Sequence, residues 1–181
     1  MLDFPNKFET DRLHIRLPLP GDGKAVYEAV TASINEFKAW LPFARKEISV
    51  DGMERSVREA HAKFLLREDL RLHIILKDTG QLIGSSGLHG IDWDIPKFEI
   101  GYWLDSRYVG KGIMTEAVQG ITDFAFDVLH ARRVEIRCDT MNARSKAIPI
   151  RLGYTLEGTF KLDSRNADNE LCDTHIYAMT R

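Results

Sequence analysis

The sequence predicts a mixed α/β fold, in which helices flank a central sheet. Two observations support this prediction. The apolar period changes from helical to strand-like near Leu72, where two short apolar runs separated by Asp78-Thr79-Gly80 indicate a β-hairpin. From Lys97 onwards, strand-like and helical runs alternate as β-α-β-α-β, which is typical of helices packed on a sheet. The length of 181 residues fits one domain, residues 1–181.

The chain opens with a predicted strand and a predicted helix. Apolar and polar residues alternate in Arg12–Leu17 as in a half-buried strand, which Pro18–Gly21 ends. Asp22 is a residue type that caps helices. The apolar face of the following helix would consist of Ala25, Val26, Ala29 and Val30.

Two further helical segments are predicted before the hairpin. The segment Glu36–Leu41 should end before Pro42, because a residue that precedes proline disfavours helical angles. Ser49 or Asp51 would cap a longer helix. Its apolar stripe would consist of Met53, Val57, Ala60 and Phe64.

The remaining elements follow from the same periodicities. The hairpin strands are Leu72–Lys77 and Gln81–Leu88, and a third strand is Lys97–Leu104. Next come helix Ile113–Leu129, strand Arg133–Cys138, helix Arg144–Leu152 and strands Tyr154–Leu162 and Glu170–Met179. The helix that starts at Ile113 should bury Ile113, Ala117, Ile121, Phe124 and Val128.

Composition excludes several classes of protein. The formal net charge of −2 gives no general attraction to nucleic acid or to an anionic membrane. Neither a membrane-length apolar run nor a signal-peptide pattern is present, so we expect a cytoplasmic location without nucleic-acid or membrane binding. Cys138 and Cys172 should be free thiols. The histidines lack zinc-site spacing, so no metal is predicted.

A glycine-bearing loop, Arg107–Gly112, joins the strand-like run Phe98–Leu104 to the helical run Ile113–Leu129. Glycines adopt backbone angles that other residues avoid, and a helix start presents unpaired N–H groups and a positive dipole end. A strand, such a loop and a helix together form a seat for a pyrophosphate. For the loop alone, an ordinary strand-to-helix turn is the alternative interpretation.

The spacing of this loop distinguishes three kinds of phosphate site. A nucleoside-triphosphate loop requires Ser or Thr after Gly-Lys, whereas here Lys111 precedes Gly112 and Ile113 follows it. A dinucleotide fingerprint fits poorly, because Thr115 stands where the third glycine belongs. The remaining pattern, Arg/Gln-x-x-Gly-x-Gly/Ala, resembles the acyl-coenzyme-A loop of the GCN5-related N-acetyltransferases (GNATs).

Further motifs around the loop strengthen this resemblance. They are Glu9-Thr10-Asp11-Arg12-Leu13, Phe98-Glu99-Ile100-Gly101-Tyr102-Trp103-Leu104-Asp105, Asn142-Ala143-Arg144-Ser145, Leu152-Gly153-Tyr154 and Leu156-Glu157-Gly158. Together they look like the branch that acetylates serine or alanine N-termini of ribosomal proteins. The resemblance covers about Phe8 to Thr180.

The GNAT resemblance implies a mostly antiparallel central sheet that splays between Phe98–Leu104 and Arg133–Cys138, leaving a cleft for the pantetheine arm of acetyl-CoA. Main-chain groups of Tyr102–Leu104 would bond this arm and polarise the thioester carbonyl. Asn142 would hold a pantetheine amide, or else act only as a helix cap. The implied cofactor-binding residues are Tyr102, Trp103, Leu104, Arg107, Val109, Gly110, Lys111, Gly112, Ile113, Met114, Asn142 and Ser145.

Three residues are candidates for proton transfer. Glu99 is the first candidate for the general base, because partial burial would raise its pKa; pairing with a basic side chain is the alternative interpretation. Asp163 is a second candidate base. Many family members carry, where this chain has Pro149, a tyrosine that acts as the general acid. In this chain Ser145 or water would therefore protonate the departing thiolate. Proline there should bend the helix or free the Ser145 carbonyl.

The predicted reaction is direct transfer of an acetyl group to the α-amine of a protein such as a ribosomal protein. The alternatives are a small amine, such as a polyamine or aminoglycoside, and a coenzyme-A-binding sensor without turnover. An aromatic stripe around Trp40 would face the acceptor or belong to the core, and the acidic stretch Asp163–Asp173 would attract a cationic amine or form a solvated loop. A homodimer would suit a site that holds a flexible peptide end.

Overall fold

The computed structural model describes residues 3–166 and 168–181. The first elements are β1 (Lys7–Glu9), β2 (Leu13–Arg16), α1 (Gly23–Ala32), α2 (Ile34–Lys38), the 3₁₀ turn η1 (Pro42–Arg45), α3 (Val50–Leu66), β3 (Leu70–Leu76) and β4 (Leu82–Asp92). Then follow β5 (Lys97–Leu104), the 3₁₀ turn η2 (Ser106–Tyr108), α4 (Ile113–Asp123), the π-helical turn η3 (Phe124–Val128), β6 (Arg133–Asp139), α5 (Ala143–Arg151), β7 (Thr155–Arg165) and β8 (Leu171–Thr180).

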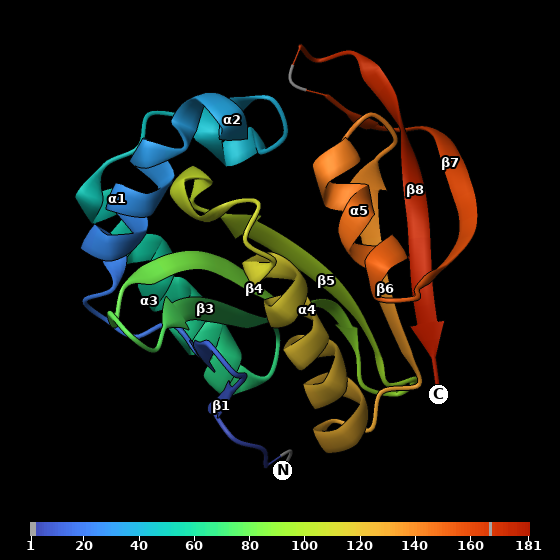
Figure 1. Ribbon diagram of the computed structural model, residues 1–181, viewed down its shortest axis with the longest axis horizontal. Coiled ribbons are helices and arrows are strands. Elements are labelled where there is room, and N and C mark those ends of the chain that lie inside the picture. The colour runs from blue at the N-terminus through green and yellow to red at the C-terminus, as the bar shows by residue number, and fades with distance from the viewer. Residues whose placement is uncertain (1–2, 167) are drawn as a thin grey trace.

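The strands form one sheet of eight in the order β1-β2-β3-β4-β5-β6-β8-β7. Neighbouring strands are antiparallel except β5 and β6, which run parallel. Figure 1 shows α4 crossing one face of this sheet and α3 lying on the opposite face. The predicted mixed, mostly antiparallel sheet flanked by helices is therefore confirmed.

Strand β5 has two differently packed faces because successive side chains point in opposite directions. Phe98 and Ile100 are each 1% exposed and belong to the main core together with Ile121 of α4. Trp103 points to the other face, where its ring lies 5.6 Å from that of Phe37 in an edge-to-face arrangement. Side chains of even number on β5 therefore face α4, and those of odd number face the first helices.

The predicted splay between β5 and β6 is present. These strands pair only through Lys97–Arg133, Phe98–Val134 and Glu99–Glu135. Beyond that point, β5 continues along β4 up to Leu104, while β6 continues along β8 up to Asp139. A V-shaped opening therefore begins immediately after Glu99.

Two local sequence signals, a helix cap and a turn glycine, are confirmed. The Ser49 hydroxyl accepts a hydrogen bond of 3.1 Å from the Gly52 N–H, which confirms it as the cap of α3. Gly80 has a φ of +69°, as the hairpin turn requires.

Other expectations were wrong. Asp22 stands at the N-cap of α1 without capping it, because its carboxylate binds Arg16 and His73 instead. Val128 is 40% exposed, since the helix after the loop changes to a π-helical turn at Phe124. The aromatic stripe is divided between its two interpretations. Phe37 belongs to the core, whereas Trp40 is 44% exposed, so the core interpretation does not hold for Trp40. Among the described residues, no helix combines the length and apolarity of a membrane span.

Candidate functional site

The opening between β5 and β6 is bordered by main chain that no neighbouring strand occupies. Residues from Ile100 to Leu104 pair with β4 along one edge, while their other edge faces the gap. Peptide groups along this edge are held rigidly by the sheet and can bond a ligand. This edge includes the main-chain groups of Tyr102, Trp103 and Leu104, to which the GNAT resemblance assigns cofactor binding.

The glycine loop leads from this edge to the start of α4. Gly110 and Gly112 have φ angles of +78° and +73°, which favour glycine. No described side chain caps α4, so the N–H groups of its first turn, including those of Ile113 and Met114, remain directed at the loop. With Lys111 beside them, these groups form a seat for an anionic pyrophosphate.

Arg107 stabilises the loop from within. Its guanidinium binds the fully buried carboxylate of Asp105, with Nη2 to Oδ2 at 2.5 Å and Nε to Oδ1 at 3.0 Å. Asp105 also accepts a hydrogen bond from the Arg107 N–H. The Ser106 N–H donates to the buried Ser33 hydroxyl at 2.7 Å, which anchors the loop to the end of α1. The Arg107 side chain was expected to bind the cofactor. In the structure its guanidinium binds Asp105 and stabilises the conformation of the loop.

A second anchor comes from the N-terminal motif. Glu116 in the first turn of α4 accepts hydrogen bonds from the Thr10 hydroxyl and from Arg12 Nε, each at 2.6 Å, and from the Arg12 N–H at 2.9 Å. Arg12 Nη1 also donates to the Lys111 carbonyl at 3.0 Å. Burial raises the pKa of Glu116, but the hydrogen bonds from Thr10 and Arg12 outweigh burial and lower it. The opening motif thus holds the phosphate loop.

The start of α5 lies across the opening from β5. Asn142 caps the helix, since its Oδ1 accepts a hydrogen bond of 3.0 Å from the Ser145 N–H. The Ser145 hydroxyl donates to the Tyr102 hydroxyl at 3.3 Å. Burial raises the pKa of the nearby Cys138 thiol, and a hydrogen bond with Ser145 opposes this effect. The predicted residues Asn142, Ser145 and Tyr102 therefore meet, and Cys138 joins them.

Tyr102 contributes a side chain that the sequence analysis overlooked. Its hydroxyl donates to the Ser145 carbonyl at 2.9 Å, and burial raises its pKa, so the phenol stays protonated at neutral pH. Tyr154 has a different partner, the Thr122 hydroxyl at 2.7 Å, and does not replace the tyrosine that is missing at Pro149. The only sequence signal for this position is the alternation of side chains along β5, which puts Tyr102 on the same face as Phe98 and Ile100.

Glu99 lies at the point where β5 and β6 separate. Burial raises its pKa, and the positive charge of Arg137 partly opposes this shift. Arg137 Nε lies 3.5 Å from Glu99 Oε2, and Arg137 also binds Glu135 at 3.1 Å. The side chain of Glu99 remains 40% exposed, so it has access to solvent and to a substrate. Both the base and the ion-pair interpretation therefore find support at this residue.

Asp163 is not brought together with Glu99. It is an exposed residue near the end of β7, the edge strand, and β6 and β8 lie between that strand and β5. Glu99 aligns across the sheet with Thr155, at the opposite end of β7. The two candidate bases are thus far apart.

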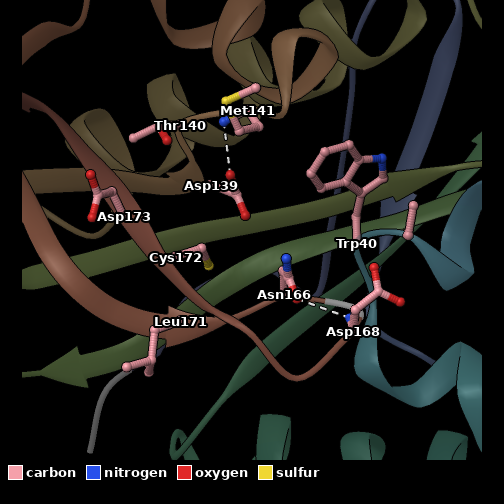
Figure 2. A pocket seen from close by; sticks show the side chains of 10 residues that line it. Trp40, Asp139, Thr140, Met141, Asn166, Asp168, Leu171, Cys172 and Asp173 are labelled. Carbon is pink, nitrogen blue, oxygen red and sulfur yellow. Dashed lines mark hydrogen bonds between the residues drawn. The ribbon is translucent and has the colours of Figure 1, made fainter.

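A cavity of about 490 Å³ lies between the end of α2 and the strands β6 and β8. Figure 2 shows Trp40 and Asp168 on one side, Asp173 on the opposite side and Asp139 between them. None of the described lining residues is a lysine or an arginine. Because side chains alternate along β6, Asp139 shares a face with Arg137, the neighbour of Glu99. The cavity and Glu99 therefore lie along the same face of the sheet.

Comparisons with known proteins agree with this geometry. A curated relative, "Putative ribosomal N-acetyltransferase YdaF" of Bacillus subtilis (strain 168), is 33% identical over 151 residues, which cover 82% of this chain and 80% of the relative. The ribosomal-protein-serine acetyltransferase of Escherichia coli (strain K12) is 31% identical over 108 residues, covering 60% and 59% of the two chains. These names confirm the resemblance to the ribosomal-protein branch.

A solved structure shares the fold. RimL, described as a ribosomal L7/L12 alpha-N-protein acetyltransferase in complex with coenzyme A, superposes with a TM-score of 0.86 at 23% identity, covering 94% of this chain and 95% of RimL. The profile of the acetyltransferase (GNAT) domain matches residues 12–155. The chain belongs to the GNAT family of acetyltransferases.

Proposed function

We propose that the protein transfers the acetyl group of acetyl-CoA directly to the N-terminal α-amine of a ribosomal protein. The observation that carries this proposal is the position of Glu99, where the strands separate and on the face that leads to the acidic cavity. The names of the E. coli relative and of RimL favour a ribosomal acceptor.

Acetyl-CoA would enter the opening with its pyrophosphate at the uncapped start of α4. The pantetheine arm would follow the free edge of β5, and the thioester would lie near Tyr102 and Ser145. Main-chain N–H groups at that edge would polarise the thioester carbonyl, because they are already oriented before the substrate binds.

The chemistry needs two proton transfers. An α-amine has a pKa of about 7.7–8, so a base must take a proton as the nitrogen attacks the carbonyl carbon. Glu99 would take this proton on the cavity side. When the carbon–sulfur bond breaks, the thiolate would take a proton from the Ser145 hydroxyl, which lies at hydrogen-bond distance from the Tyr102 phenol. The phenol would turn from the Ser145 carbonyl to return a proton to Ser145, and water would then reprotonate Tyr102. No covalent enzyme intermediate is required.

The acidic cavity would receive the acceptor. Asp139 and Asp168 would attract a cationic amine terminus, whereas Asp173 already pairs with Lys161 at 2.8 Å. The exposed indole of Trp40 offers an apolar or cation–π contact. The same lining also suits a small polycation, which makes a polyamine or an aminoglycoside the second candidate acceptor. A protein N-terminus differs from these in carrying a single α-amine on a chain that continues away from the cavity.

A panel of amines tests the proposal. Purified protein would be mixed with acetyl-CoA and with peptides that begin with Ser or Ala, polyamines or aminoglycosides, and thiol release and product mass would be followed. We expect product on the peptide α-amine and loss of turnover in Glu99→Gln with coenzyme binding retained. Preference for a small amine would contradict the protein acceptor, and coenzyme binding without any product would favour a sensor.

A further inference from the structure

A histidine lies beside the proposed base. In the antiparallel pairing of β4 with β5, His89 stands directly opposite Glu99. Residues opposite each other in such a pair have Cβ atoms about 4.5–5.5 Å apart and share a face of the sheet. His89 and Glu99 also interact electrostatically, since the histidine acts to lower the pKa of the carboxyl. The imidazole is therefore a close neighbour of Glu99.

The imidazole ring of His89 lies over Gly101 of β5. A Cβ atom added to Gly101 would lie 3.5 Å from His89 Cδ2 and 3.7 Å from Nε2, which is ordinary van der Waals contact. The edge of the ring that carries Nε2 thus lies over the main chain two residues beyond Glu99, whereas Nδ1 contacts Asp69. This is where β5 has separated from β6.

Asp69 determines which ring nitrogen carries the proton. Its Oδ2 lies 2.7 Å from His89 Nδ1. Burial raises the pKa of Asp69, but the hydrogen bond to His89 outweighs burial and lowers it, so the group is a carboxylate at neutral pH. A carboxylate accepts a hydrogen bond from Nδ1–H, which leaves Nε2 of the neutral ring as an acceptor. The His89 side chain is 33% exposed and can exchange protons with water.

Several charges surround this pair. On the β6 side, Arg137 and Glu135 act on Glu99, and on the Asp69 side, Arg71 and Lys63 act on the aspartate. Cations thus flank both carboxylates, while Asp69 and Glu99 offset the charge of an imidazolium between them.

Two other histidine–carboxylate pairs in the described residues differ in position. His73 pairs with Asp22 at 2.9 Å, but its side chain is only 2% exposed. His14 pairs with Glu9 at 3.0 Å on β2 near the far edge of the sheet. The pair of His89 and Asp69 combines contact with water and proximity to the separated strands.

We propose that His89, oriented by Asp69, is a positioning and proton-transfer residue that acts through Glu99. Glu99 first takes a proton from the acceptor amine, forming a carboxyl O–H bond. That bond then breaks as the proton passes through a water molecule to His89 Nε2, because the Glu99 carboxylate contacts Arg137 rather than the imidazole directly, and the imidazolium releases it to water. The carboxylate is thereby regenerated for the next turnover. This inference rests on the proposed function, because it requires Glu99 to be the base.

The test compares variants with the best amine of the panel. His89→Asn keeps a donor for Asp69 but cannot carry the proton, and Asp69→Asn removes the negative charge that stabilises the imidazolium. We expect each to lower kcat about 10- to 100-fold, within the range of general acid–base effects, with the KM for acetyl-CoA unchanged. The acid limb of the kcat profile should become less steep in His89→Asn, because one ionisation remains in place of two. Added imidazole should restore part of the turnover of His89→Ala.

A matched control is His14→Asn, which removes a histidine–carboxylate contact of similar length far from the opening. It should leave kcat and the pH profile unchanged. If Glu99→Gln abolishes turnover while His89→Asn keeps the wild-type rate and profile, the relay is wrong and the proposed base stands. If Glu99→Gln keeps full turnover, the proposed base is wrong, and the relay is wrong with it.

A second measurement does not depend on any acceptor. The tautomer of His89 can be read from the nitrogen-15 NMR shifts of its ring nitrogens in the wild type and in Glu99→Gln. We expect protonated Nδ1 and unprotonated Nε2 in the neutral ring, and a change in the Nε2 signal when Glu99 loses its charge. The opposite tautomer, or identical Nε2 signals in both proteins, would overturn the proposal.

Discussion

The phenolic hydroxyl of Tyr102 donates a hydrogen bond of 2.9 Å to the main-chain carbonyl of Ser145. In an α-helix this carbonyl would accept from the N–H of residue 149, which is absent because that residue is Pro149. The proline thus frees an acceptor on α5, and a side chain of β5 occupies it. A hydroxyl is thereby fixed beside Ser145, in a chain that lacks the family's usual tyrosine.

Tyr102→Phe should lower kcat by about tenfold and leave the affinity for acetyl-CoA nearly unchanged, because the lost hydroxyl serves proton transfer rather than cofactor binding. The free energy of unfolding should fall by about 1 kcal/mol, as is common when one buried hydrogen bond is lost. Steady-state kinetics and urea unfolding measure both effects.

The matched control is Tyr154→Phe, which removes another buried hydroxyl, held by Thr122. We expect a similar loss of stability without a change in kcat. Equal effects of the two substitutions on kcat would show that the Tyr102 hydroxyl has only a structural role.

Glu99→Gln should abolish most turnover and stabilise the folded protein at neutral pH. Burial raises the pKa of Glu99 in the folded state, so the folded protein binds this proton more tightly than the unfolded chain does. The ionised carboxyl therefore costs stability, and this cost appears as the pH rises through the folded-state pKa. The gain in Tm of Glu99→Gln should accordingly be present near pH 8 and absent below about pH 4, where both states are protonated in the wild type.

Arg12→Ala should raise the KM for acetyl-CoA about tenfold, a loss of about 1.4 kcal/mol, with kcat little changed. The guanidinium holds Glu116 and the Lys111 carbonyl, so its removal loosens the phosphate loop without touching the reacting atoms. Arg181→Ala is the control, since it removes an exposed ion pair with Asp127 at 2.7 Å. A change in kcat alone would contradict a role confined to the loop.

Trp40→Ala and Asp168→Asn should each raise the KM for a cationic acceptor and leave that for acetyl-CoA unchanged, because both residues line the cavity rather than the cofactor opening. The effect of Asp168→Asn should shrink as salt concentration rises, since an exposed charge is screened. Asp163→Asn serves as the control for turnover and should leave kcat and the KM for acetyl-CoA within about twofold, because Asp163 lies at the opposite end of β7 from the position that aligns with Glu99. A strong loss of kcat in Asp163→Asn would restore it as a candidate base.

Three expectations about the whole molecule remain predictions: a homodimer, a cytoplasmic location and the boundaries of a single domain. A homodimer would be tested by the molar mass in solution, measured by light scattering during gel filtration.

The sequence by itself determined the features that depend on neighbouring residues. Glycines at 110 and 112 permit the positive φ angles that the loop adopts, Ser49 bonds the N–H three residues later, and proline at 149 removes an N–H from its own helix. Apolar periodicity likewise specified nearly every strand and helix, because burying one face of each element is a local requirement.

Only the tertiary structure decided which distant side chains meet. Glu116 binds Arg12 across 104 residues, His89 faces Glu99 through the register of β4 and β5, and Trp40 reaches the cavity wall instead of the core. These contacts depend on the order and splay of the strands, which no local pattern encodes. The sequence therefore predicted the candidate phosphate site at the glycine loop, whereas it did not predict which side chains would lie beside Glu99.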